Sequence, residues 1–364
     1  MRYCILTDEQ DENIDFTPTV IIGFYQSRHK TAFYTRYKDF QKRFPHVEVF
    51  GCSTESNIYN ELPYVDIDDT RKPVFICLDM QKDAFGFECI DMTKPVSFPA
   101  KKYKKHGAIV LASYYDERLE SLVAELPGYI GTEKIFGAIA SSDTIVAAET
   151  EVFYNGTYYP EHMIVWLIDQ KKYTLDGMSI HHFQPVGLEL EVTNVKEKTL
   201  YSIDNRPALS VLEEMVGELL DETISSFNHP FFLKRDPKQC YDETPLCSIE
   251  SIDRQKQSIT LYRHLQKKNN LKVGISLKQK DQHKKLQQFY RFRTNNAVAL
   301  MFNCIGVKRN LGMVEYLYLI DMKKHLNIPF IGFHSFGEIG PFDNGHRPIL
   351  HNQTISIAIL SEKV

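Results

Sequence analysis

Apolar and polar positions repeat one pattern three times along the chain, within residues 20–55, 108–142 and 297–338. In each repeat an apolar strand precedes a helical stretch, and a second apolar strand contains glycine and ends in small polar residues. Near-continuous apolar strands joined by a crossover helix are typical of parallel neighbours in a sheet covered by helices. The pattern therefore predicts an α/β fold built from recurring strand-helix-strand units.

Two further segments, residues 150–159 and the region that begins near residue 200, add to the predicted fold. Residues 150–159 indicate a hairpin with its turn at Asn155 and Gly156, so we expect mixed sheets. The pattern changes near residue 200, where residues 204–207 resemble a helix start and the apolar positions from Val211 to Leu220 recur on one helical face. A chain of 364 residues is long enough for two cores, and we predict two domains, 1–200 and 201–364.

The polar residues that follow the three second strands are candidates for binding a ligand. In α/β sheets, ligands bind beyond the carboxyl ends of strands, where glycine lets a ligand approach the backbone. Each glycine serves equally well in a tight turn. Glu338, expected in a turn, either meets the amino group of a ligand or caps the backbone. The predicted ligand-binding residues are Cys52, Ser53, Thr54, Glu55, Gly137, Ala140, Ser141, Cys304, His334, Ser335 and Glu338.

Composition narrows the class of protein. Apolar residues make up 43% and charged residues 25%, as in soluble globular proteins, and the net charge of -4 gives no general attraction to nucleic acid. We expect the basic runs 101–105 and 278–285 to be solvated. The N-terminus is acidic within ten residues and no apolar run approaches about 20 residues, so we expect a cytoplasmic protein without a membrane span. Seven cysteines without a C-x-x-C pair argue against disulfides and zinc.

Catalytic motifs are missing, since the chain has no G-x-G-x-x-G after a strand, no phosphate-binding loop, no H-E-x-x-H and no G-x-S-x-G. Cys52 is either the nucleophile of a cysteine-dependent enzyme or a buried thiol, and no neighbouring base or cation favours the first. Haem is a possible cofactor, with His181, His182, His334 and Cys304 as axial candidates, because His and Cys are its usual ligands. Adjacent His181 and His182 would point to opposite faces of a strand.

Several segments together resemble the FIST family. The run Phe50-Gly51-Cys52-Ser53-Thr54-Glu55-Ser56 resembles the signature of its N-terminal domain, to which we assign residues 1–200. The run from Gly332 to Pro341 resembles the signature of its C-terminal domain, to which we assign residues 201–364. Shorter matches lie at 136–140, 204–209, 303–306 and 351–354, so the resemblance spans nearly the whole chain.

The resemblance implies a sensory module that binds a small, amino-acid-like ligand and regulates a separate partner, such as a histidine kinase or a cyclic-dinucleotide enzyme. It does not imply an enzyme. Some relatives look like haem proteins that respond to nitric oxide and control a kinase, so a haem-based sensor is the second hypothesis. A cysteine-dependent enzyme using Cys52 is the third.

Overall fold

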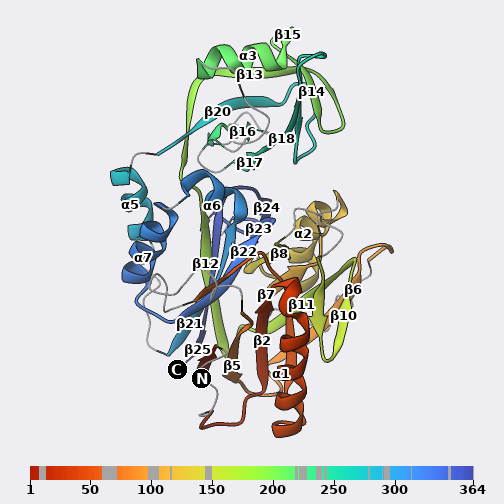
Figure 1. The fold of residues 1–364 in the computed structure, drawn as a ribbon, viewed down its shortest axis with the longest axis vertical. Coiled ribbons are helices and arrows are strands. Elements are labelled where there is room, and N and C mark those ends of the chain that lie inside the picture. The colour runs from red at the N-terminus through yellow and green to blue at the C-terminus, as the bar shows by residue number, and fades with distance from the viewer. Residues whose placement is uncertain are drawn as a thin grey trace.

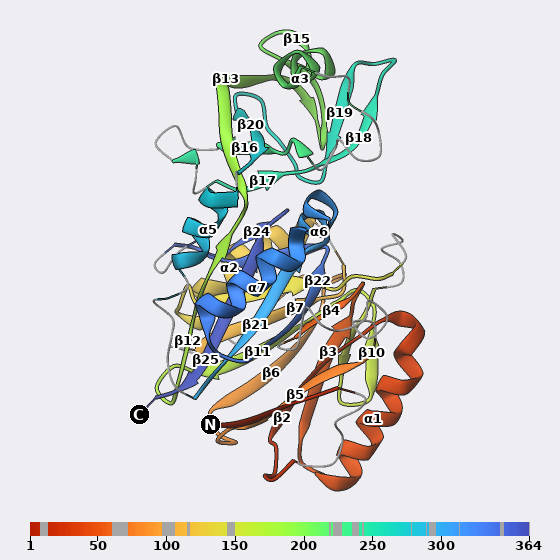
Figure 2. The same ribbon diagram turned by 60° about the vertical axis from the view of Figure 1, so that its left-hand side comes forward.

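The computed structural model describes residues 1–7, 14–59, 72–96, 106–114, 117–143, 150–217, 220, 228–234, 240–241, 244–277, 279–288, 290, 296–312, 314–342 and 346–363. The described residues between 183 and 276 form a cap, which stands on one end of a larger main body (Figure 1, Figure 2). Both chain termini lie in the main body, at the end away from the cap (Figure 1). The main body contains three sheets, each built around one strand-helix-strand unit.

The first sheet is built on the unit β2 (Val20–Tyr25), α1 (Lys30–Arg43) and β3 (Glu48–Ser53), in which β2 and β3 are parallel. The short 3-10 helix η1 (Ser27–His29) precedes α1. The helix buries Phe33, Tyr37 and Phe40 at i, i+4 and i+7 against the outer face of the sheet. The other strands, in the order β1-β5-β2-β3-β9-β10, are β1 (Arg2–Leu6), β5 (Val74–Asp79), β9 (Val152–Tyr154) and β10 (Thr157–Tyr159).

The second sheet repeats this plan with β7 (His106–Ala112), α2 (Glu117–Ile130) and β8 (Ile135–Ile139). Leu119, Val123 and Leu126 of α2 pack on its outer face. The other strands, in the order β24-β23-β8-β7-β11-β6, are β6 (Phe85–Asp91), β11 (His162–Asp169), β23 (Gly337–Gly340) and β24 (Ile349–His351).

The third sheet contains the parallel pair β21 (Ala297–Cys304) and β22 (Phe330–Ser335), joined by α6 (Ile305–Leu311) and α7 (Val314–Leu326). Leu319 and Met322 of α7 pack on its outer face. Helix α5 (Gln279–Gln287) lies beside α7. The other strands, in the order β12-β25-β21-β22-β4, are β4 (Asn57–Tyr59), β12 (Tyr173–Ile180) and β25 (Ile355–Glu362).

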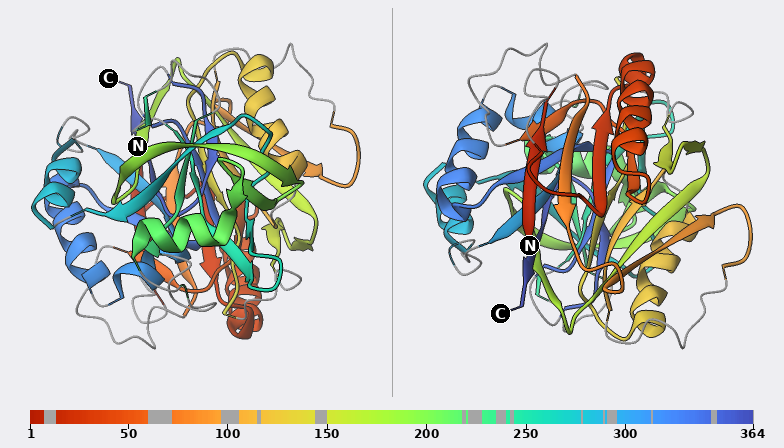
Figure 3. Two further views of the ribbon diagram at one scale, coloured as in Figure 1. Left: turned by 90° about the horizontal axis from the view of Figure 1, so that it is seen from above. Right: turned by 90° about the horizontal axis from the view of Figure 1, so that it is seen from below.

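The inner faces of the three sheets share one apolar core. Buried side chains from the first sheet (Phe24), the second (Trp166) and the third (Phe333) belong to a single cluster, and the Phe24 and Phe333 rings lie 4.8 Å apart. Helices α1, α2 and α7 occupy separate sides of the molecule, outside this core (Figure 3). The main body is therefore a three-sheet assembly with its helices on the periphery.

Each unit also passes a strand to the next sheet. After β3 the chain enters the third sheet, where β4 pairs antiparallel with β22. After β22 it enters the second sheet, where β23 pairs antiparallel with β8. The next strand described after β8 is β9, which pairs antiparallel with β3 in the first sheet. These three transfers form a closed ring, and they bring the carboxyl ends of β3, β8 and β22 to a common place.

In the part of the cap that the structure describes, helix α3 (Ala208–Val216) packs on a fourth sheet. Its strands are β13 (Phe183–Lys196), β14 (Thr199–Ile203), β15 (Arg206–Pro207), β16 (Phe231–Lys234), β17 (Leu246–Cys247), β18 (Ile249–Asp253), β19 (Ser258–Leu261) and β20 (Asn270–Ser276). The predicted helix after residue 207 is present. It ends at Val216 because Gly217 adopts a left-handed φ of 76°, whereas the prediction extended it to Leu220.

The three strand-helix-strand units are confirmed, as are the mixed sheets and the hairpin, whose turn residues Asn155 and Gly156 have φ of 44° and 93°. The described part of the chain is richer in strand than the α/β prediction implied. Among the helices of this part, none is both long and apolar enough to cross a membrane. The basic run 101–105 lies outside the described residues.

The alternative that glycine at the strand ends serves a tight turn was wrong for Gly51, Gly137 and Gly332. All three lie inside their strands, β3, β8 and β22. A Cβ atom at these positions would lie 1.7–1.8 Å from a carbonyl oxygen of the neighbouring parallel strand. These glycines therefore allow the close approach of two parallel strands.

Candidate ligand site at the junction of three strand ends

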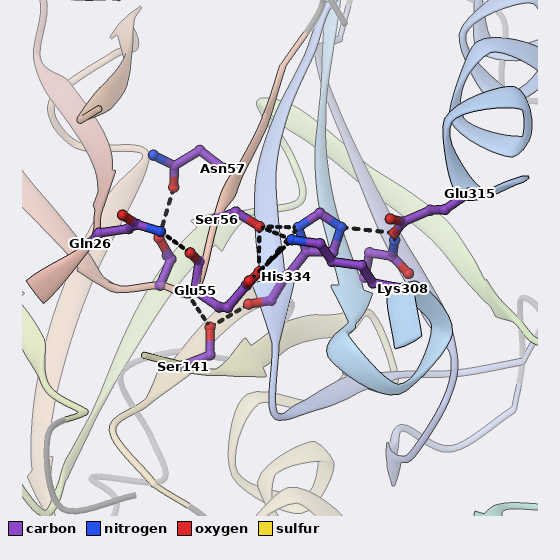
Figure 4. Close-up of polar contacts among 10 residues, drawn as sticks. Gln26, Glu55, Ser56, Asn57, Ser141, Lys308, Glu315 and His334 are labelled. Atoms are coloured by element: carbon purple, nitrogen blue, oxygen red, sulfur yellow. Dashed lines mark hydrogen bonds and ion pairs between the residues drawn. The ribbon is translucent and has the colours of Figure 1, made fainter. Parts of the chain in front are cut away.

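The segments that follow β3, β8 and β22 are joined by hydrogen bonds that cross between the units. Ser141 N donates to Ser53 O at 3.1 Å, and Glu55 N donates to Ser141 Oγ at 2.8 Å. His334 N donates to Ser56 O at 2.9 Å. The structure thus brings together Ser53, Glu55, Ser141 and His334 from the predicted site. We call this place the junction (Figure 4).

An ion pair forms the outer side of the junction. Lys308 of α6 places its Nζ 2.8 Å from Glu55 Oε2 and 2.9 Å from Ser56 Oγ. The two side chains are 32% and 24% exposed, so solvent reaches both charges. Gln26 donates to the backbone carbonyl of Glu55 and holds this segment in place. The junction therefore presents one positive and one negative group to solvent.

A buried chain of polar contacts continues inward from this pair. His334 lies between Ser56 Oγ, 2.7 Å from its Nδ1, and Glu315 Oε1, 2.8 Å from its Nε2. Asn303 of β21 donates to the same Glu315 oxygen. Because a carboxylate only accepts hydrogen bonds, His334 Nε2 carries the proton directed at Glu315. Glu315 is 2% exposed and stands in the first turn of α7, so the chain links the surface pair to a helix.

The electrostatic balance of the junction is clearest at Glu55. Burial raises the pKa of its carboxyl, but the charges of Lys308 and His334 and the hydrogen bonds from Lys308 and Ser56 outweigh burial and leave the pKa below its ordinary value of 4.5. Glu55 is thus ionised at neutral pH and available to a cation.

This lowered pKa predicts a pH dependence of stability. A carboxyl whose pKa is lower in the folded protein stabilises the fold above its unfolded pKa, and that contribution is lost as the pH falls through the folded value. We expect Glu55→Gln to reduce stability at pH 7 and to flatten the loss below pH 4.5. Urea unfolding from neutral to acidic pH measures this. The exposed control Glu161→Gln should keep the wild-type slope, and an unchanged slope in Glu55→Gln would contradict the assignment.

Glu338 lies elsewhere than predicted, inside strand β23 rather than in a turn, and it is fully buried. Ser335 Oγ donates to Oε1 at 2.5 Å and Thr354 N to Oε2 at 3.3 Å. Burial raises the pKa of Glu338 well above its usual range, against the opposing hydrogen bonds from Ser335, Thr354 and Cys304. Burial therefore disfavours the ionised form of Glu338, which is the form that would meet the amino group of a ligand.

The remaining predicted residues are buried and structural. Burial raises the pKa of the Cys52 thiol well above its usual range, so Cys52 lacks the thiolate that a nucleophile needs. Burial likewise raises the pKa of the Cys304 thiol, and the Glu338 carboxyl beside it adds to the effect. Thr54 Oγ1 donates to Asn57 Oδ1 at 2.8 Å, and Ala140 N donates to Ala112 O at 2.7 Å.

The four axial candidates do not fit a haem in this conformation. Both ring nitrogens of His334 are hydrogen-bonded, and His182 Nε2 lies 2.7 Å from Asn310 Oδ1. His181 and His182 connect β12 to β13 instead of standing in a strand, and they are 3% and 1% exposed. Burial lowers the pKa of His182 to about 4. A porphyrin needs an open face beside its ligand atom, and these residues present none.

Sequence reasoning missed Lys308 and Glu315. Leu319 and Met322, which pack on the third sheet, follow Glu315 by four and seven residues. Glu315 therefore lies on the apolar face of α7. An acidic residue on the buried face of a helix indicates a polar partner, and this pattern was available in the sequence. Lys308 had no such indication, because it meets Glu55 only through the transfer of β4 into the third sheet.

Models of known protein families match most of the chain. Residues 19–206 match the family model of the FIST N domain, and residues 208–341 match that of the FIST C domain. The chain therefore belongs to the FIST family, whose domains act in sensing and signal transduction. The border between the two matches falls inside the cap. No curated protein matches the chain significantly.

Proposed function

We propose that this protein is a cytoplasmic sensor that binds an amino-acid-like molecule at the junction and regulates a separate signalling protein, such as a histidine kinase or a cyclic-dinucleotide enzyme. The observation that carries the proposal is the partly exposed pair of Glu55 and Lys308, backed by the buried chain from Ser56 to Glu315. The family supplies the class of function, and the pair supplies the chemistry of the ligand.

A zwitterion matches the two charges of this pair. Its carboxylate replaces Glu55 as the partner of Lys308, and its ammonium replaces Lys308 as the partner of Glu55, so no charge is left unpaired. The exchange alters the contacts of Ser56, which touches both Lys308 and His334. His334 in turn touches Glu315 of α7. Binding can thus shift the position of α7, and by linkage a partner that recognises one position changes the affinity for the ligand equally.

A thermal-shift screen of the standard amino acids tests this proposal. We expect at least one of them to raise the melting temperature of the wild type, since a ligand that binds only the native state stabilises it. Both Lys308→Met and Glu55→Gln should weaken that ligand by roughly tenfold or more, because each leaves one ligand charge without a partner.

Lys256→Met is the matched control, because Lys256 forms an exposed pair with Asp253 in the cap, away from the junction. It should bind like the wild type. Equal affinity in the wild type and in Lys308→Met, or no shift with any amino acid, would overturn the proposal.

A further inference from the structure

Helix α7 packs one face on the third sheet and exposes another to solvent. Leu319 and Met322 are buried in the packed face. Val314 and Leu317 lie three residues apart, which makes them neighbours on the helix surface, and they are 46% and 53% exposed. The row that they begin continues along the helix to Lys324. We call this row, residues 314, 317, 321 and 324, the outer face of α7.

Large exposed apolar side chains gather around this helix. Within the described part of the chain they are Leu188, Tyr262, Tyr290, Val314 and Leu317. Two of the five stand on the outer face of α7, and the ring of Tyr290 lies 4.7 Å from the ring of His325 in the last turn of the same helix. Single exposed apolar residues are common on any protein, whereas neighbouring ones indicate a contact with another molecule.

The surroundings of the outer face are basic. Residues 278–328 contain ten lysines and arginines but three acidic residues, in a chain whose net charge is -4. Helices α5, α6 and α7 of this segment lie on one side of the main body (Figure 1, Figure 2). Their exposed cations include Lys284, Arg309, Lys323 and Lys324. The apolar pair of the outer face therefore stands within a positive surface.

Local ion pairs do not cancel this charge. Lys284 and Lys324 each have their Nζ 3.5 Å from an aspartate oxygen on their own helix, and their side chains are 73% and 69% exposed. Exposed pairs of this kind contribute little to stability. Both lysines can therefore turn to a carboxylate that another molecule brings.

The outer face shares its helical turn with the inner end of the polar chain from the junction. Glu315 follows Val314 directly but is buried, with its Oε1 2.8 Å from His334 Nε2 (Figure 4). Backbone hydrogen bonds hold one turn of a helix together as a unit. Any movement of Glu315 is therefore passed on to Val314 and Leu317.

These features define the chemistry of a molecule that covers the outer face. Apolar side chains at a spacing of three residues on one helix fit the groove of another helix. The cations around them favour acidic residues along the borders of that second helix and repel basic ones. An amphipathic helix with an apolar stripe between glutamates and aspartates meets both conditions.

We propose that the outer face of α7 is the surface through which this protein binds its signalling partner, and that the partner contributes an acidic amphipathic helix. The control of this contact by an amino acid rests on the proposed function, because the ligand acts at the junction. The surface itself needs no ligand. It is formed by side chains that are already exposed.

A designed peptide of about 18 residues tests the proposal, with leucines at helical spacing and glutamates at the other positions. Fluorescence anisotropy measures its binding, and a counterpart with lysines in place of the glutamates serves as the basic probe. We expect the wild type to bind the acidic peptide, more weakly as the salt concentration rises, and not to bind the basic one. Leu317→Gln should weaken binding by about tenfold or more. Its melting temperature should stay that of the wild type, because Leu317 is exposed.

The cap offers a matched control for each part of the surface. Leu188 is 81% exposed, so Leu188→Gln makes the same change away from α7 and should bind the acidic peptide like the wild type. Lys324 and Lys256 are both 69% exposed, and each pairs with an aspartate three residues earlier. Lys324→Glu should weaken binding by about tenfold, whereas Lys256→Glu should not change it.

Equal binding of the acidic peptide by Leu317→Gln and Leu188→Gln, or no binding by the wild type, would overturn the proposal. Binding of the wild type to vesicles of phosphatidylcholine and phosphatidylserine, lost in Leu317→Gln, with no binding of the peptide, would assign the outer face to an anionic membrane instead. These titrations contain no amino acid. Failure of every amino acid to bind would therefore overturn the proposed function and leave the peptide result as it stands.

Discussion

Replacing Gly332 with alanine is expected to destabilise the protein by more than about 3 kcal/mol, at or beyond the upper range for overpacked cores. The added Cβ would lie 1.7 Å from Met301 O, a backbone atom that cannot move without separating β21 from β22. Adjacent strands are held about 4.8 Å apart by their hydrogen bonds, so the overlap costs ladder bonds as well as packing. Urea unfolding measures the loss.

The chain offers a matched control for this prediction. Gly128 lies in α2, and a Cβ there would meet no atom within 4 Å. Gly128→Ala should leave stability unchanged or raise it by up to about 1 kcal/mol, because alanine favours the helix. Gly51→Ala and Gly137→Ala should behave like Gly332→Ala, since their Cβ atoms meet equivalent carbonyls. A loss below about 1 kcal/mol in Gly332→Ala would show that the strands adjust and that the explanation is wrong.

Replacing His334 with alanine should cost about 1–3 kcal/mol, the range for leaving a buried polar group without its hydrogen-bond partner. Glu315 would keep only Asn303 as a donor inside the third sheet, and Ser56 would lose its contact with the ring. Urea unfolding of His334→Ala, Glu315→Met and the double variant measures the coupling between the two side chains.

The double variant should be more stable than the sum of the single losses predicts, by more than about 1 kcal/mol, because it leaves no buried carboxylate. Lys308→Ala is the comparison at the exposed end of the chain of contacts, and a loss of about 0–1 kcal/mol is expected there. Additive losses in the double variant would mean that His334 and Glu315 act separately.

The sequence predictions that the structure confirms rested on local patterns of apolar residues. The apolar strands 20–25, 106–112 and 297–304 and the helices after them have clear periodicities, and the rule that such units are parallel placed their strand ends on one side. The meeting of Ser53, Ser141 and His334 depends in addition on the strands that pass between the three sheets. Helix α3 was predicted from its start and its apolar face.

The exchange of strands between sheets had no local pattern to reveal it. β4 and β9 have three residues each and β23 has four, too few for a periodicity. Pairing between distant segments determines which charge faces Glu55, so Lys308 escaped prediction. The glycines of β3, β8 and β22 were misread for the same reason, because the carbonyl beside each belongs to another strand.

The ring of transferred strands has a consequence for how the chain is made. β8 emerges early in synthesis, but its neighbour β23 is nearly 200 residues away, since β8 ends at Ile139 and β23 begins at Gly337. β4 likewise stays without its pairing partner until β22, which begins at Phe330, has been synthesised. The N-terminal half therefore leaves the ribosome with unpaired strand edges, which are sites of aggregation until the last residues arrive. We expect the halves to fold only together, slowly and as one cooperative unit.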